Sequence, residues 1–325
     1  MKKKKGLNRM SSHEIRIGTR GSQLALYQAN WVKDRLTEVH PHLHVTLMKI
    51  KTTGDKIQDA PLAKIGGKGL FVKEIEEALI QRKIDLAVHS IKDVPTEFPE
   101  GLHLAAITKR EDPRDVLISK DGILLKDLPR GARIGTSSLR RQAQLLHFRG
   151  DFEMIPLRGN LDTRIRKLKT MDLDGVVLAL AGVKRLNLEK NITEILPTEI
   201  SLPAVGQGAL GIETRIGDQE TEGYLQFLND PESSVAVSAE RAFLKKLEGG
   251  CQVPIAAFGR MEGGILHIDG LVGRTDGKKL IRRHLEGPPR EAEAMGTRLA
   301  EILLENGAGE ILEEVYHHST PTVQI

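Results

Sequence analysis

Residues 85–93, DLAVHSIKD, carry the clearest evidence for the fold class. Their first four positions form a short, largely apolar run, which predicts a buried strand. Polar side chains follow at once, so His89, Ser90 and Asp93 gather where this strand ends. In open α/β sheets, ligands bind beyond the carboxyl ends of the strands. The stretch therefore predicts an α/β sheet with a polar site at its edge.

Strand and helix patterns alternate before this stretch. The periodicity predicts strands at residues 15–18 and 45–50 and a helix at 71–79. Ser22 is positioned to cap a further helix. We expect one face of that helix to carry Leu24, Tyr27, Trp31 and Leu36.

The same alternation restarts after the stretch. Strands are predicted at residues 132–135, 154–157 and 175–180, and helices at 139–148 and 161–168. Such alternation is typical of parallel sheets. It predicts two successive α/β units of roughly one hundred residues each, the size of a small domain. Stretches containing proline or glycine, at 95–101, 112–115 and 202–208, separate the units.

The order of predicted strands and helices changes after Asp230 and Pro231. A helix is predicted at residues 235–247, antiparallel strands at 255–258, 265–272 and 279–285, and helices at 292–305 and 310–316. Strands followed by helices indicate a separate small α+β domain.

The composition limits which binding partners and which cellular compartment we expect for this protein. The chain has 325 residues, a net charge of +4 and only 3% aromatic residues. A nearly balanced charge and few stacking side chains disfavour nucleic acid as a partner. The chain contains no run of 18 apolar residues, so no membrane span is predicted. No apolar segment follows the lysines at 2–5, so no secretory signal is predicted. We expect a cytoplasmic protein with a solvated lysine tail; a nucleic-acid-binding arm is the alternative interpretation of the tail.

Basic side chains recur at three successive strand ends of the second unit. The segments are GTSSLRR at 135–141, LRGNLDTR at 157–164 and the pair Lys184 and Arg185. Helix amino termini favour anions, and arginine binds carboxylate or phosphate through two parallel hydrogen bonds. Recurrence at neighbouring strand ends favours an anion-binding cleft over five unrelated solvated arginines. These are Arg140, Arg141, Arg158, Arg164 and Arg185.

The first unit offers matching groups. The segment TRGS at residues 19–22 places a cation at a strand-to-helix turn, and GGKG at 66–69 is a basic, glycine-rich loop. This loop lacks the spacing of a P-loop, and either an anion-binding lid or an ordinary exposed loop fits it. Asp93 either pairs with its neighbour Lys92 or serves as a carboxylate that stabilises positive charge on a substrate.

The only cysteine of the chain, Cys251, lies in GGCQVP at 249–254. A single thiol excludes an intramolecular disulfide and a cysteine-rich metal site. Free cysteines are commonly buried as small hydrophobes, which is the stronger interpretation from the flanking residues alone. The two preceding glycines leave a second interpretation open, an accessible loop in which the thiol reacts.

Two further patterns predict no site. The segment GQGALG at 206–211 fits G-x-G-x-x-G, but a strand follows it in place of the helix that a dinucleotide site requires. The histidines at 40, 42, 44, 317 and 318 have no convincing partner ligands, so we predict no metal.

Nine motifs occur together in one order. They are TRxS, GGKGLF, VHSIKDVP, EDPRD, GTSSLRRQ, LRGNxxTR, LAxAGxKRL, LPAVGQGA and EGGCQVPI. This combination resembles the porphobilinogen deaminase (hydroxymethylbilane synthase) family over about residues 15–316. The match has no departure at the motif positions, and only the lysine-rich start and the last few residues fall outside it.

The resemblance implies a transferase of tetrapyrrole and haem biosynthesis. Such an enzyme joins four porphobilinogen molecules head to tail, releases ammonia at each addition and forms hydroxymethylbilane. It implies a dipyrromethane cofactor bound to Cys251 as a thioether, and Asp93 as the catalytic carboxylate. It also implies a monomer.

The resemblance further implies two periplasmic-binding-protein-like (type II) lobes with mixed sheets flanked by helices. A small C-terminal α+β domain with a three-stranded antiparallel sheet then carries the cysteine loop. The first lobe would comprise residues 1–108 and 209–226, the second 109–208, and the last domain 227–325.

The implied site residues fall into three groups. The cofactor would contact Ser90, Lys92, Asp93, Thr136, Ser137, Ser138, Arg140, Arg141, Arg164, Gly182 and Arg185. The substrate would contact Arg20, Ser22, Gln28, Arg158, Arg164, Arg185 and Gln207. A lid would contain Lys64, Gly66, Gly67, Lys68 and Phe71. A non-catalytic, two-lobed anion-binding protein is the alternative function; it accounts for the arginines but gives no use to Cys251 or Asp93.

Overall fold

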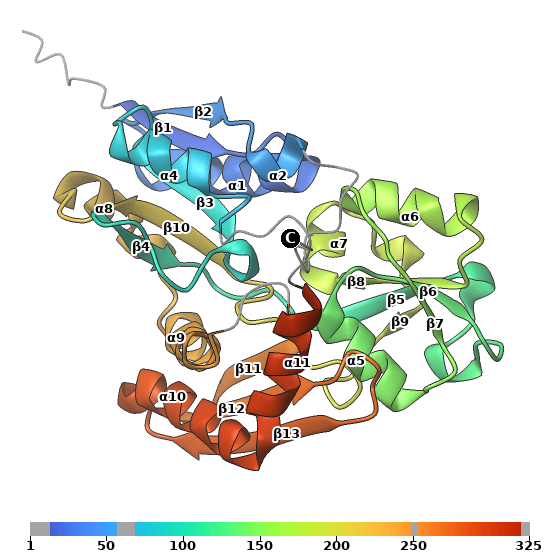
Figure 1. Cartoon of the computed structure of the whole chain (residues 1–325). Helices are drawn as coiled ribbons and strands as arrows, with labels where there is room; N and C mark the ends of the chain where they lie inside the picture. Colours follow the sequence, from blue (N-terminus) through green and yellow to red (C-terminus); the bar gives the residue numbers. More distant parts are fainter. Residues whose placement is uncertain (1–13, 57–68, 249–252, 320–325) are drawn as a thin grey trace, which may run out of the picture.

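The computed structural model describes residues 14–56, 69–248 and 253–319 (Figure 1). Three sheets organise these residues, two of five strands and one of three. Figure 1 shows them as two helix-flanked lobes and a C-terminal domain that contacts both. The predicted combination of two α/β lobes and a small α+β domain is confirmed.

The first sheet has the strand order β2-β1-β3-β10-β4. Its strands are β1 (Glu14–Thr19), β2 (His44–Lys49), β3 (Leu86–Ser90), β4 (Leu102–Ile107) and β10 (Leu210–Arg215). β1 is parallel to β2 and β3, but β10 runs antiparallel to both of its neighbours. The alternation of strands and helices suggests a parallel sheet and does not reveal this crossing, but the mixed sheets that the family resemblance implies are confirmed: a strand from after the second lobe returns antiparallel between β3 and β4.

In the described residues, four α-helices accompany this sheet. They are α1 (Gln23–Val39), α2 (Thr53–Lys56), α4 (Lys73–Ile80) and α8 (Gln219–Leu225). Ser22 caps α1 as predicted, and its hydroxyl accepts a hydrogen bond from the Ala25 amide. The predicted buried face of α1 is partly wrong, because Tyr27 and Trp31 are exposed. The residues of α1 that are buried are Gln28, Ala29, Val32 and Leu36.

The second sheet has the order β7-β6-β8-β5-β9. Its strands are β5 (Asp115–Ser119), β6 (Arg133–Gly135), β7 (Glu153–Ile155), β8 (Gly175–Ala179) and β9 (Glu194–Ile195), and its helices are α5 (Leu139–Phe148), α6 (Leu161–Thr170) and α7 (Leu180–Arg185). β6 is parallel to β7 and β8, and β5 is antiparallel to β8 and β9. Each of these two sheets therefore has four strands that run in one direction and one antiparallel strand, β10 in the first sheet and β5 in the second.

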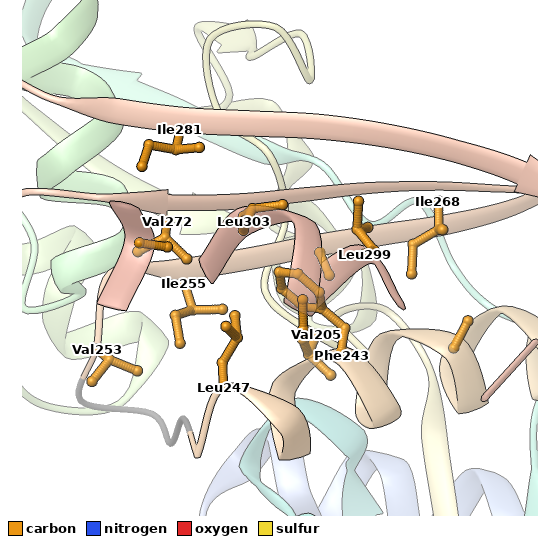
Figure 2. Packing of buried hydrophobic residues seen from close by; sticks show 14 of the residues in the cluster. Val205, Phe243, Leu247, Val253, Ile255, Ile268, Val272, Ile281, Leu299 and Leu303 are labelled. Atoms are coloured by element: carbon orange, nitrogen blue, oxygen red, sulfur yellow. The ribbon is translucent and has the colours of Figure 1, made fainter. Parts of the chain in front are cut away.

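The C-terminal domain packs its helices on a three-stranded antiparallel sheet. The strands are β11 (Ile255–Glu262), β12 (Ile265–Gly273) and β13 (Leu280–Gly287), and the helices are α9 (Pro231–Lys246), α10 (Ala292–Leu303) and α11 (Gly309–Ser319). Figure 2 shows Phe243 and Leu299 in the core between sheet and helices. Leu247 and Val253, which flank the segment that contains Cys251, are buried in the same core. Cys251 itself lies outside the described residues.

Candidate active site

A pocket lies at the carboxyl ends of β1 and β3 in the first lobe. Its lining consists of Arg20, Ser22, Leu24, Ala25, Gln28, Phe71, Val72, Val88, His89, Ser90 and Asp93. The turn Ile91–Asp93 follows β3 directly and carries Lys92 and Asp93. The Gln28 amide donates a 2.9 Å hydrogen bond to the Ser90 hydroxyl, which explains why a glutamine occupies the buried face of α1.

Arg20 lies at this pocket with an acidic partner. Its Nη2 atom is 2.5 Å from Oδ1 of Asp55, and its guanidinium lies 4.2 Å from the centre of the Phe71 ring. Burial disfavours ionisation of Asp55, but hydrogen bonds from Arg20 and Thr52 prevail and hold the pKa of Asp55 below its usual value. Arg20 is thus oriented by Asp55 and Phe71 toward the pocket that it lines.

The second lobe buries a compact ionic cluster around Asp115, the first residue of β5. Arg140 Nη1 lies 2.9 Å from Oδ2 of Asp115, and Arg141 Nη2 lies 2.7 Å from Oδ1. Ser201 and Gln207 donate further hydrogen bonds to the same carboxylate, at 2.8 and 2.9 Å. Burial alone would raise the pKa of Asp115, but the two guanidinium groups hold it far below its usual range. Asp115 therefore fixes both arginines at the start of α5.

Asp93 interacts electrostatically with one cation of each lobe, Lys92 and Arg164. Burial lowers the pKa of Lys92 to about 8, an effect that Asp93 opposes and that Arg141 and Arg140 reinforce. Burial and the charge of Arg141 lower the pKa of Arg164 to about 10, again with Asp93 opposing and Arg158 adding to the shift. A negative group placed among these side chains would be favoured, because each cation lies in a partly desolvated region.

Two nitrogen atoms of this region are buried without a hydrogen-bond partner among the described residues. They are Nη2 of Arg158 and Nε of Arg141. A buried donor with no acceptor costs about 1–3 kcal/mol, so both arginines are suited to an acidic ligand that completes their hydrogen bonding. Among the predicted cations, these two provide the clearest sign of an anion site.

The remaining predicted residues have structural partners. Ser137 bonds to the Leu157 backbone at 2.9 Å, Ser138 caps α5, and the Thr136 hydroxyl accepts from the Ser138 amide. Arg185 donates to the Gly208 carbonyl at 2.7 Å, and burial lowers its pKa, with Glu111 opposing.

Gly182 packs closely at the junction of the lobes. A Cβ atom there would lie 3.0 Å from Leu161 and 3.6 Å from Leu24. Lys64, Gly66, Gly67 and Lys68 lie outside the described residues.

The glycines of the segment GQGALG allow it to pack closely against neighbouring residues. A Cβ at Gly206, whose φ is +68°, would lie 2.0 Å from Cγ2 of Ile91 in the turn that carries Asp93. Gln207 is almost fully buried and bonds to Asp115, and the segment leads into β10. The prediction that no helix follows is confirmed, and the glycines let the chain approach the turn.

One group of side chains in the described parts of the chain is arranged closely enough to share a metal ion. It consists of His267, His284 and Glu286 on the C-terminal sheet. None of the three lines the pocket. No helix in the described parts has both the length and the hydrophobicity that a membrane crossing requires.

Replacing Asp115 with asparagine is expected to destabilise the protein strongly. The change leaves two buried guanidinium groups without their counter-ion, a loss of about 3–5 kcal/mol. Asp112→Asn in the same EDPRD segment is the matched control, because Asp112 pairs with the more exposed Arg114 and its loss costs about 1 kcal/mol or less. Thermal unfolding measures both variants. Equal melting temperatures would contradict the role given to Asp115.

The comparisons with known proteins agree with this geometry. Residues 15–223 match the family model described as porphobilinogen deaminase, dipyromethane cofactor binding domain, and residues 234–305 match porphobilinogen deaminase, C-terminal domain. The chain belongs to the porphobilinogen deaminase family. The resemblance inferred from the motifs is thereby confirmed.

Curated porphobilinogen deaminases are similar to this chain along nearly its whole length. The protein of Geotalea uraniireducens is 58% identical over 307 residues, which cover 94% of this chain and 96% of that protein. The protein of Citrifermentans bemidjiense is 59% identical with the same coverage. Among solved structures, the periplasmic aliphatic sulphonate binding protein SsuA from Escherichia coli is 13% identical, with a TM-score of 0.41, over 95% of this chain and 92% of that one.

The residues present fit the dipyrromethane cofactor of the family. Each of its two pyrrole units carries an acetate and a propionate, so the group is a polyanion. The unpartnered nitrogen atoms of Arg141 and Arg158, together with Arg164 and Lys92, provide donors and positive charge for such carboxylates. A deaminase-family site therefore accounts for the cations better than a collection of surface arginines does.

Sequence reasoning missed the acids that orient these cations. Asp55 and Asp115 lie 35 and 26 residues away from the arginines they bind. Asp115 lies in the quoted motif EDPRD, but nothing in the motif indicates a partner, because the pairing depends on the sheet.

Proposed function

We propose that this protein is a porphobilinogen deaminase, or hydroxymethylbilane synthase. It condenses four porphobilinogen molecules stepwise, head to tail, releases one ammonia at each addition and yields the linear hydroxymethylbilane. The observation that carries the proposal is a carboxylate, Asp93, at the end of β3 among the cations Lys92, Arg141 and Arg164. Family membership over nearly the whole chain supports it.

In this proposal the acidic side chains of cofactor and substrate contact separate groups of residues. The carboxylates of the dipyrromethane would be held by Lys92, Arg140, Arg141, Arg164 and Arg185, with Ser90, Thr136, Ser137, Ser138 and Gly182 nearby. Incoming porphobilinogen would contact Arg20, Ser22, Gln28 and Arg158, with Arg164, Arg185 and Gln207 in support. The pocket that Arg20, Ser22, Gln28 and Asp93 line together supports the second assignment.

Asp93 is the proposed catalytic residue. Loss of ammonia breaks the carbon–nitrogen bond of the aminomethyl group, whose electron pair leaves with the nitrogen. The remaining substrate carbon is electron-poor, and its positive charge is shared with the pyrrole N–H. A fixed carboxylate at that N–H stabilises the charge and holds the proton there.

The arginines bind and orient in this mechanism. Their guanidinium groups neutralise acetate and propionate side chains, so an anionic product can lengthen without repelling the next anionic substrate. Asp115 and Asp55 hold Arg141 and Arg20 in place before substrate arrives, which reduces the ordering cost on binding. When bound, the dipyrromethane supplies a tethered pyrrole with a free α-carbon that accepts the first unit.

The remaining assignments are also proposals. The lobes would comprise residues 1–108 with 209–226 and residues 109–208, and residues 227–325 would form the cysteine-bearing domain; the three sheets support this division. The segment 64–71 would act as a lid. We propose a cytoplasmic monomer, because one chain supplies every cation of the cleft.

Intact mass and thiol titration test the function together. We expect the purified protein to exceed its sequence mass by two pyrrole units, located on the peptide that contains Cys251, and to convert porphobilinogen. After denaturation it should show no free thiol, because the sulfur of its only cysteine is in a thioether. An unmodified protein that is nevertheless active would contradict the proposed cofactor. An unmodified protein that binds anions but releases no ammonia would identify a two-lobed binding protein instead.

A further inference from the structure

The turn that carries Lys92 and Asp93 follows β3. The last residues of β3 pair with a neighbouring strand on one side only. β3 pairs with β1 at Leu86 and Ala87, and with β10 as far as Ser90. The last residues of β3 therefore depend on β10 for their position. The backbone of the turn adds one bond to the same region, from the Ile91 amide to the Ala209 carbonyl at 3.1 Å.

A buried acid on β10, Glu213, binds His89 of β3, two residues before this turn. Oε2 of Glu213 lies 2.8 Å from Nε2 of His89, and both side chains are at most 5% exposed. His89 itself lines the pocket with Ser90 and Asp93. The second oxygen of Glu213, Oε1, is buried and has no hydrogen-bond partner among the described residues. Burying an isolated carboxylate costs free energy, so neighbouring groups must stabilise the side chain of Glu213.

The other side of the turn is held by Arg241 from α9 of the C-terminal domain. Its Nη2 atom donates to the Pro95 carbonyl at 2.7 Å, and its Nη1 atom donates to the Val94 carbonyl at 3.3 Å. These two carbonyls directly follow Asp93 in the chain. Figure 1 shows α9 between the first sheet and the C-terminal sheet. Burial lowers the pKa of Arg241 to about 10, and the charge of Glu213 opposes this.

We propose that Glu213 and Arg241 are positioning residues for Asp93: Glu213 fixes His89 on the strand that leads into the turn, and Arg241 holds the two carbonyls that follow Asp93. This inference rests on the proposed function, in which Asp93 is catalytic. The two contacts lie on either side of the turn, at His89 and at Val94 and Pro95. The second contact also connects the turn to α9 of the C-terminal domain.

The charge of Glu213 also acts on a neighbouring acid. Glu76 of α4 is buried nearby, and its pKa is raised to about 7 by burial and then by the charge of Glu213; His89 opposes the shift, and Glu77 adds to it.

Glu213→Gln in the full-length, cofactor-loaded protein tests the inference. The change keeps the shape of the side chain and removes its charge. We expect hydrogen exchange of the backbone amides at 91–94 to rise about tenfold, because the turn opens locally more often. We expect kcat to fall about tenfold or more with KM for porphobilinogen changed less than about twofold, because Asp93 acts in the transition state.

Glu222→Gln is the matched control. Glu222 also pairs with a histidine in the first lobe, His103, at 2.9 Å, but lies on α8 and outside the pocket lining. It should leave both the exchange at 91–94 and kcat unchanged. Equal effects of the two variants, or faster exchange spread evenly along β3 and β10, would overturn the positioning role.

Arg241→Lys provides the second measurement if Glu213→Gln fails to fold. Lysine keeps the charge but lacks the forked guanidinium whose two nitrogen atoms reach separate carbonyls, so exchange at the amides of 93, 94 and 96 should rise while β3 stays protected. Unchanged exchange in this variant would also overturn the inference. Hydrogen exchange does not require turnover, so it tests the positioning role even in a protein that does not convert porphobilinogen. Failure of the wild-type protein to convert porphobilinogen would refute the proposed function alone.

Discussion

Asp93→Ala is expected to reduce the turnover of porphobilinogen about a hundredfold or more, a loss of at least ~2.7 kcal/mol of transition-state stabilisation. The reason is electrostatic. Charge-stabilising groups fixed in a partly desolvated site contribute about 10²–10³ in rate, because they need no reorganisation when charge develops. The charge of Asp93 acts on Lys92 and Arg164, so its removal also leaves these two cations without that neighbouring acid.

Steady-state kinetics on three variants separate charge from shape and from stability. Asp93→Asn keeps the side-chain volume and should be nearly as impaired as Asp93→Ala. Asp34→Ala, an exposed position on α1, is the control and should retain wild-type turnover. Circular dichroism and the melting temperature should be similar in all three proteins. If Asp93→Ala kept more than about a tenth of the wild-type rate, a loss under ~1.4 kcal/mol, the catalytic assignment would be wrong.

Much of the fold could be predicted from residues that are close together in the sequence. The runs at 15–18, 85–88 and 175–180 are strands in the structure because alternation and apolar continuity are local properties. The helices and strands after Pro231 also fall near their predicted places. Each of these predictions depends on a window of a few residues, in which the hydrophobic period is sufficient evidence.

The sheet partners could not be predicted in this way. β10 follows the second lobe in the chain but pairs between β3 and β4, more than a hundred residues earlier. β5 begins at Asp115, inside a segment that resembles a linker because it contains Pro113 and four charged residues. Neither feature has a local signal, since strand pairing is determined by the tertiary arrangement.

The site was predicted unevenly for the same reason. Arginines at strand ends could be found from spacing, and their clustering around Asp93 follows from the sheet geometry. The acids that pair with residues of the site could not be found from spacing, because Asp55, Asp115 and Glu213 reach their partners from distant segments of the chain. The sequence therefore indicates which groups bind the anion, but not which groups hold them in place.

Cys251→Ala is expected to abolish activity and to leave the protein without its cofactor. Cys251 is the only thiol of the chain, so no other side chain can form the thioether. The variant should have the mass calculated from its sequence. It should also melt at a lower temperature than the loaded wild-type protein, because the cations near Arg141 and Arg158 then lack the carboxylates that complete their hydrogen bonds.

Added phosphate distinguishes this electrostatic explanation from simple damage to the loop. Phosphate ions can occupy the same cationic sites, so they should raise the melting temperature of Cys251→Ala more than that of the loaded wild-type protein. The flanking residues Leu247 and Val253 remain anchored in the C-terminal core, so the change at Cys251 should not unfold the domain. A Cys251→Ala protein that carries the two additional pyrrole units, or that forms hydroxymethylbilane at the wild-type rate, would refute the tether, since a growing chain attached elsewhere would not need this sulfur.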